Sequence, residues 1–211
     1  TQNQAFSAIL FLYKQVLKVD LDRIQNVRRA KRTPNLPVVL TQEETRQVLD
    51  HLPGNQRLMG MLMYGSGLRL LECLRLRVKD VDFSRREITV RHGKGGKDRR
   101  TVLPTELIRP LQAHLREVRK QHDSDLTKQA GYVEMPHALA RKFPNASRSW
   151  LWQWVFPATR TYTDRETGEV HRHHYHESAL QRSVGQAAWK AGIPKRVTCH
   201  TFRHTFATHL L

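Results

Sequence analysis

The stretch TCHTFRHTFATHLL, residues 198–211, predicts an amphipathic helix. Its apolar side chains recur at helical spacing and form one stripe, made of Cys199, Phe202, Phe206 and Leu210. Thr198 and Thr201 are suitable caps for the start of this helix.

The polar face of this helix favours an anion. His200 and Arg203 are three residues apart, so both project from one side near the helix N-terminus. That end carries unpaired N–H groups and the positive pole of the helix dipole. Arginine adds a forked, permanently charged donor, and histidine adds a donor or a proton. A phosphate group is the ligand best suited to this combination.

A second basic position follows a glycine turn much earlier in the chain. The stretch YGSGLRLLE, residues 64–72, contains two glycines that permit a sharp bend between apolar helical segments. Arg69 begins the helical segment after the bend, and Glu72 can reach back toward it. Further on, the stretch HGKGGKDR, residues 92–99, forms the glycine-rich tip expected between two short strands.

In this order and spacing, the three stretches resemble the active-site signature of the tyrosine recombinases, or phage integrase family. The resemblance spans about residues 37–211 and implies an α+β, mostly helical catalytic domain with a small antiparallel β-hairpin. It implies catalytic roles for Arg69, Lys94, His200 and Arg203, with Glu72 and His204 in support.

The implied reaction is DNA strand cleavage and rejoining through a 3′-phosphotyrosyl intermediate, without a metal or cofactor. Arg69 and Arg203 would bind the nonbridging phosphate oxygens, Lys94 would protonate the leaving oxygen, and His200 would manage a proton. The family's nucleophilic tyrosine lies beyond the helix of Arg203 and is preceded by another histidine or tryptophan, and this sequence stops at Leu211, before either position. We therefore expect a fragment, cut at both ends, that binds DNA without cleaving it alone.

The charge of the chain points to the same partner. Its 36 lysines and arginines against 19 acidic residues give a formal net charge of +17 and a pI near 10.6. Such an excess is typical of proteins that bind a polyanion, nucleic acid before membrane surface. Apolar runs are too short to cross a membrane, and Cys73 and Cys199 suit a reducing compartment. A cytoplasmic, bacterial protein is expected.

The chain before the catalytic domain divides into two segments. Residues 1–19 predict an amphipathic helix, which the resemblance assigns to the end of an N-terminal core-binding domain. Residues 20–37 predict a basic linker with two prolines. Its DNA-binding candidates are Arg28, Arg29, Lys31 and Arg32. The catalytic domain then occupies residues 38–211, incomplete at its C-terminus.

Residues 131–176 are an unusual insertion. Trp150, Trp152 and Trp154 alternate as in a strand with one aromatic face, and a histidine-rich stretch follows at residues 171–176. Such an insertion resembles the integron integrases, which recombine gene cassettes and use a folded single-stranded site as one substrate. The resemblance implies a homotetramer on DNA. Besides Lys97 in the hairpin tip, Trp152, His173 and His174 are candidates for contacting DNA.

Two other functions fit parts of the sequence. The chain could be a non-catalytic DNA-binding remnant of the same fold, or a metal-dependent nuclease that uses the histidine cluster. The second is disfavoured because the cluster lacks cysteines and the ligand spacing of a tetrahedral site. No metal site is expected.

Overall fold

The computed structural model describes residues 2–19, 36–91 and 96–211 of the chain, as two units, Thr1–Leu36 and Pro37–Leu211. In the first unit, helix α1 (Gln2–Phe11) continues as a π-helical turn at Leu12–Val16, so the helix predicted there is present. The four linker residues Arg28, Arg29, Lys31 and Arg32 lie outside the described residues.

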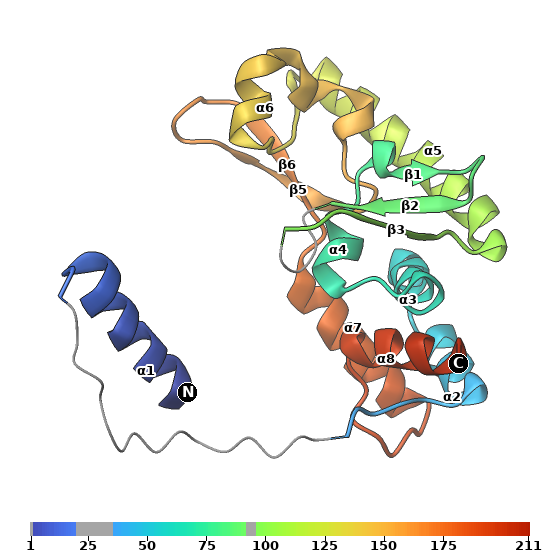
Figure 1. Cartoon of the computed structure of the whole chain (residues 1–211). Helices are drawn as coiled ribbons and strands as arrows, with labels where there is room; N and C mark the ends of the chain where they lie inside the picture. Colours follow the sequence, from blue (N-terminus) through green and yellow to red (C-terminus); the bar gives the residue numbers. More distant parts are fainter. Residues whose placement is uncertain (1, 20–35, 92–95) are drawn as a thin grey trace. The chain divides into compact units, whose positions relative to one another are not determined.

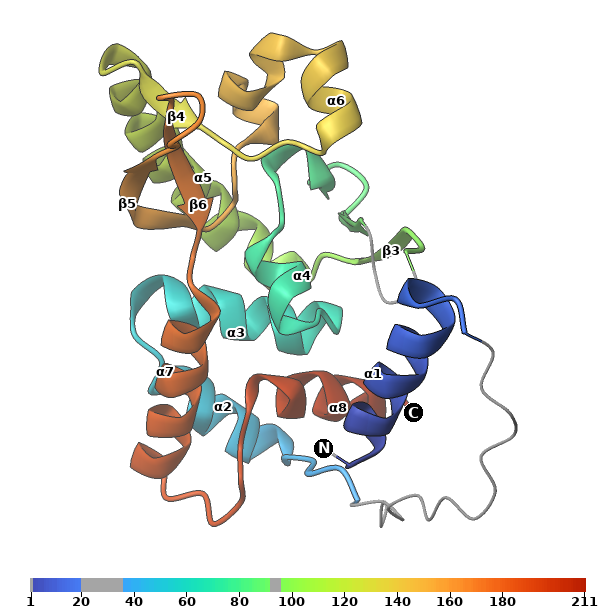
Figure 2. The same cartoon turned by 90° about the vertical axis from the view of Figure 1, so that its left-hand side faces the viewer.

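A group of helices forms one half of the second unit. It contains α2 (Gln42–Asp50), α3 (Gly54–Ser66), the short α4 (Leu70–Leu74), α7 (Glu177–Lys190) and α8 (Cys199–His209). The predicted capping box opens α2, where the Thr41 side chain accepts the Glu44 N–H and the Glu44 carboxylate accepts the Thr41 N–H. Figures 1 and 2 show α8 beside α3, and Phe202 of α8 is completely buried there.

The helix predicted on residues 198–211 is present, and its apolar stripe becomes more exposed toward its end, with Phe206 half-buried. Cys199 and Phe202 are buried, but Leu210 is 70% exposed. Leu210 follows the last residue of α8, His209, as its C-cap. Thr198 and Thr201 form the expected cap, with the Thr201 hydroxyl accepting the Thr198 N–H at 3.0 Å.

A three-stranded antiparallel sheet lies next to these helices. It consists of β1 (Val81–Asp82), β2 (Glu87–Val90) and β3 (Arg99–Val102), in that order. β2 and β3 form the predicted hairpin, with Val90 opposite Arg99 at the end nearest the glycine-rich tip. Residues 92–95 of that tip, including Lys94, lie outside the described residues.

The long helix α5 (Thr105–Thr127) leads from this sheet to the region of the insertion. There, a second sheet has the order β4-β6-β5, in which β6 (Val170–His174) pairs in parallel with β4 (Ala130–Tyr132) and in antiparallel fashion with β5 (Pro157–Thr163). Helix α6 (His137–Lys142) and two 3₁₀ turns, Pro144–Arg148 and Trp150–Trp152, connect β4 to β5. None of the helices in the described part of the chain is long and apolar enough to cross a membrane.

The tryptophans of the insertion are not in a strand, so that prediction is wrong. Trp150–Trp152 is a 3₁₀ turn, and Trp154 makes only an isolated bridge to Arg77. The buried side-chain amide of Gln153 donates to the carbonyl oxygens of Ser147 and Ser149 and of the more distant Gly131, and these hydrogen bonds hold the backbone bent. Consequently the three indoles do not share one face, and Trp154 alone of the three is fully buried.

A buried ion pair attaches β6 to α5. The Arg172 guanidinium donates to both carboxylate oxygens of Asp125, at 2.6 and 2.8 Å, and also to the carbonyls of Ala158 and Thr159 in β5. Both side chains of the pair are about nine-tenths buried, at 9% and 10% exposure. Each of the three guanidinium nitrogens of Arg172 donates at least one hydrogen bond, so its buried charge is compensated. These bonds connect α5, β5 and β6.

Candidate functional site

The turn between α3 and α4 sets the position of Arg69. Gly67 ends α3 in the left-handed conformation, with φ of +61°. Arg69 then caps α4, and Glu72 folds back so that its carboxylate accepts the Arg69 N–H and one Arg69 guanidinium nitrogen, each at 2.8 Å. The predicted contact between these two residues is therefore present.

Arg203 reaches the same turn from α8. Its guanidinium donates to the Gly67 carbonyl, and the same nitrogen lies 4.0 Å from the Glu72 carboxylate. A Cβ on Gly67 would lie 2.5 Å from the ring of Phe206, so α8 approaches the turn as closely as a glycine allows. The absence of a side chain at Gly67 thus lets Arg69 and Arg203, far apart in sequence, share one carboxylate.

A third guanidinium, not identified from the sequence, completes the cluster. Arg99, the first residue of β3, donates to both carboxylate oxygens of Glu72 at 2.9 and 2.7 Å. The Glu72 side chain is only 9% exposed beneath the three arginines. A sequence signal exists, because Arg99 follows the glycine-rich tip directly, but nothing local indicates that its partner lies in another element.

The electrostatics of this arginine cluster, Arg69, Arg99 and Arg203 around Glu72, favour an anion. Burial raises the pKa of Glu72, but hydrogen bonds from Arg99 and Arg69 outweigh burial and lower that pKa to about 2. Burial and the charges of Arg69 and Arg99 lower the pKa of Arg203, against the attraction of Glu72. Three positive groups around one carboxylate leave an excess positive charge on partly exposed side chains.

Two histidines of α8 lie beside this cluster. The rings of His200 and His204 are nearly perpendicular, with centroids 5.1 Å apart. Burial, followed by the nearby charges of His204, Arg203 and Arg69, lowers the pKa of His200. The imidazole of His200 therefore stays neutral to lower pH than usual, with one nitrogen free to accept a proton.

A groove of roughly 680 Å³ connects the arginine cluster to the insertion. Arg69 and Glu72 line one end, and the predicted residues Trp152, His173 and His174 line the other. Of these, Trp152 and His173 are partly exposed, whereas His174 is buried. The predicted DNA-contact residue Lys97 is exposed beside the hairpin and is not among the residues lining the groove.

The groove contains basic residues that the sequence analysis did not identify. Lys79 holds its ammonium 2.8 Å from the ring centre of Trp152, and the Arg77 guanidinium lies 3.9 Å from that of Trp154. Burial lowers the pKa of Lys79 to about 8, with help from Arg91 and Arg77 and against Asp80. Arg77 and Lys79 alternate in sequence just before β1, which is the only local signal for them.

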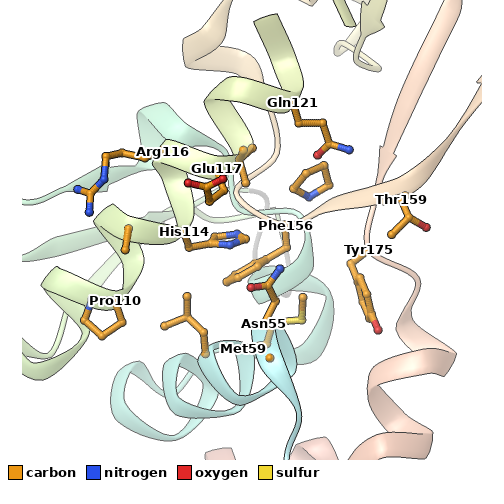
Figure 3. A pocket seen from close by; sticks show the side chains of 16 residues that line it. Asn55, Met59, Pro110, His114, Arg116, Glu117, Gln121, Phe156, Thr159 and Tyr175 are labelled. Carbon is orange, nitrogen blue, oxygen red and sulfur yellow. The ribbon is translucent and has the colours of Figure 1, made fainter. Parts of the chain in front are cut away.

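A second cavity, of roughly 650 Å³, lies between α3, α5 and the start of β5 (Figure 3). Its wall includes His114, which shares a hydrogen bond of 2.7 Å with the Val155 carbonyl and stacks on Phe156. None of the site residues predicted from the sequence lines it. Within the described ranges, no three histidine, cysteine or acidic side chains are grouped so as to hold a metal ion.

The described structure is a mostly helical domain with small sheets, in which three arginines surround Glu72 beside a histidine pair, and this fold is that of tyrosine recombinase catalytic domains. The chain belongs to the phage integrase family, whose model matches residues 38–211.

Curated relatives agree with this membership. An integrase/recombinase of Escherichia coli is 44% identical over 211 residues, which are all of this chain and 63% of that protein. Tyrosine recombinase XerA of Pyrococcus furiosus is 30% identical over 193 residues, 90% of this chain and 54% of that protein. The chain thus spans less than two thirds of the length of these curated relatives.

Two solved structures support the fold. The crystal structure of XerA recombinase has a TM-score of 0.55 at 24% identity, covering 100% of this chain and 62% of that one. The structure of XerH recombinase bound to its difH substrate has a TM-score of 0.56 at 21% identity. The match covers 97% of this chain and 52% of the XerH chain.

Proposed function

We propose that residues 38–211 are the catalytic domain of a site-specific recombinase that cleaves and rejoins DNA through a 3′-phosphotyrosyl intermediate. The observation that carries this proposal is the convergence of Arg69 and Arg203 on Glu72, beside His200. Residues 1–19 would be the end of a core-binding domain, and residues 20–37 a basic linker that contacts DNA.

Each site residue predicted from the family resemblance has a task in this reaction. Arg69 and Arg203 would neutralise the nonbridging oxygens of the scissile phosphate, on which negative charge grows in the transition state. His200 would bind the phosphate through one nitrogen and transfer a proton through it, consistent with its lowered pKa. Glu72 would orient Arg69, and His204 would support His200. Lys94, outside the described residues, would protonate the leaving 5′-oxygen.

The substrate in this proposal is DNA. The net charge of +17 supports it, as does the capture of the related XerH on its difH substrate in a pre-cleavage complex. Recombination of two sites requires several protomers, and a homotetramer on DNA is the assembly we propose. Such a protein would act in the bacterial cytoplasm, where its DNA is.

Of the recombinases, the integron integrases are the class that we propose. The support is the insertion at residues 131–176, whose Trp152 and His173 line the same groove as Arg69. Gene cassettes would then be the mobile elements, and a folded single-stranded site one of the substrates.

The proposed reaction is tested by trapping its intermediate. We expect the full-length gene product, mixed with a nicked suicide substrate in excess chelator, to become covalently attached to the DNA 3′-end. Because the arginine cluster supplies the charge that a metal would otherwise supply, chelation should have no effect. Denaturing gel electrophoresis with labelled DNA measures the adduct. Cleavage that requires a divalent metal would instead support a nuclease, and binding without an adduct would support a DNA-binding remnant.

Base recognition by the insertion is tested separately. We expect Trp152→Ala and the double variant His173→Ala/His174→Ala to weaken binding to a bulged DNA hairpin more than to the same hairpin without bulges. An aromatic ring that stacks on an unpaired base contributes about 1–3 kcal/mol. Lys79 covers one face of Trp152, so the base would use the other face or displace the lysine.

Fluorescence anisotropy at fixed salt measures both affinities. Trp189→Ala is the matched control, since Trp189 is 81% exposed on α7, away from the groove. Equal losses on both hairpins, with circular dichroism unchanged, would contradict base recognition by the insertion.

A further inference from the structure

Arg99 differs from the other two arginines in how it uses its donors. Both terminal nitrogens of its guanidinium are bonded to the Glu72 carboxylate, one to each oxygen. Arg69 gives the carboxylate one terminal nitrogen and its backbone N–H. The nearest guanidinium nitrogen of Arg203 lies 4.0 Å from the Glu72 carboxylate. Of the three guanidiniums, that of Arg99 therefore makes the most hydrogen bonds to the Glu72 carboxylate.

The two hydrogen bonds from Arg99 to Glu72 have a consequence for Arg203. A carboxylate that is 91% buried and ionised needs close positive partners, and a bidentate arginine satisfies it best. Without Arg99, the oxygen that lies 4.0 Å from Arg203 would lose its shortest ion-pair contact, at 2.7 Å. Arg203 would then be drawn toward Glu72 and away from the position in which its charge is available to a phosphate.

From this geometry we propose that Arg99 is a positioning residue, which saturates Glu72 so that Arg69 and Arg203 remain available for the phosphate. The proposal rests on the proposed function of the cluster and adds a residue to it. The ion pair of Arg99 with Glu72 also joins the first residue of β3 to the first turn of α4. The pair therefore keeps a fixed separation between the sheet and the turn that carries Arg69.

The alternative is that Arg99 binds DNA directly, since its side chain is 32% exposed. A double-mutant cycle separates the two roles, because a residue that acts only through Glu72 has no further effect once Glu72 is neutral. We expect Arg99→Ala to slow single-turnover cleavage by the full-length gene product about 100-fold, as small misplacements of catalytic groups do. In a Glu72→Gln background, the same substitution should change the rate by no more than about twofold.

Three controls keep the experiment decisive. Arg100→Ala, the exposed neighbour that pairs with Glu87 at 3.5 Å, should leave the rate nearly unchanged. DNA affinity should be the same for the native protein and Arg99→Ala, because positioning affects the rate and not the binding. Arg99→Lys keeps the charge but cannot form two parallel hydrogen bonds, and it replaces the alanine variant if thermal melting shows that Arg99→Ala is unfolded.

The outcomes are distinguishable. Equal losses from Arg99→Ala in both backgrounds, or a loss of DNA affinity that accounts for the slower rate, would overturn the positioning role and leave the proposed function intact. If the native full-length protein forms no cleaved product, the proposed function fails, and this inference fails with it.

Discussion

Alanine in place of Arg69 or Arg203 is expected to slow strand cleavage by the full-length gene product at least about 100- to 1,000-fold, the usual cost of losing one preorganised donor to a developing charge. Both guanidiniums are partly exposed beside Glu72, and in the proposed reaction the charge that they would meet grows only as the phosphate is attacked. Binding of the intact site should change little, since each arginine contributes more to the transition state than to the ground state.

Cleavage of a labelled suicide substrate at saturating protein measures the first effect, and a mobility-shift titration measures the second. Arg57→Ala is a suitable control, because Arg57 forms an exposed ion pair with Asp50 on the surface of the helical half. Near-native cleavage by either variant would remove that arginine from the active site. A parallel loss of binding and cleavage would assign it to DNA docking.

The second large effect concerns Lys94. We expect Lys94→Ala to slow cleavage of ordinary DNA by about 100- to 10,000-fold, the range of general acid catalysis. A substrate with a 5′-bridging phosphorothiolate should restore most of the rate, since its sulfur leaves without being protonated. The ratio of the two rates, measured in single turnover, isolates the proton-transfer step.

Lys97→Ala provides a matched control, since it removes a lysine from the same glycine-rich segment. This variant should be slowed equally on both substrates, or not at all. If the phosphorothiolate does not rescue Lys94→Ala, then Lys94 is not the acid, and Lys97 becomes the residue to test.

The parts of the site that the sequence predicted are those with local causes. The capping geometry of Arg69 and Glu72 needs only three residues of separation, and the helix of Arg203 follows from its stripe and its threonine cap. The hairpin of β2 and β3 follows from two short strands around a glycine-rich segment. In each case the interaction that decides the structure lies within a few positions along the chain.

The parts that could not be predicted depend on contacts between distant segments. Arg99 meets Glu72 only after the sheet has packed beside α4, so its role is invisible in the local sequence. The tryptophans alternate as in a strand, yet Gln153 bends them by bonding to carbonyls that include the distant Gly131. A period of two is thus weak evidence for a strand where a buried amide can offer the backbone other partners.

The ion pair of Arg172 with Asp125 limits how residues 131–176, the proposed insertion, could be transplanted into another protein of this fold. Asp125 belongs to α5 and lies before the proposed insertion at residues 131–176, whereas Arg172 lies within it. Exchanging residues 131–176 alone would therefore leave one buried charge without its counterpart, a defect that typically costs about 3–5 kcal/mol. The natural unit of exchange begins earlier, within α5, and a graft designed on sequence boundaries would be cut in the wrong place.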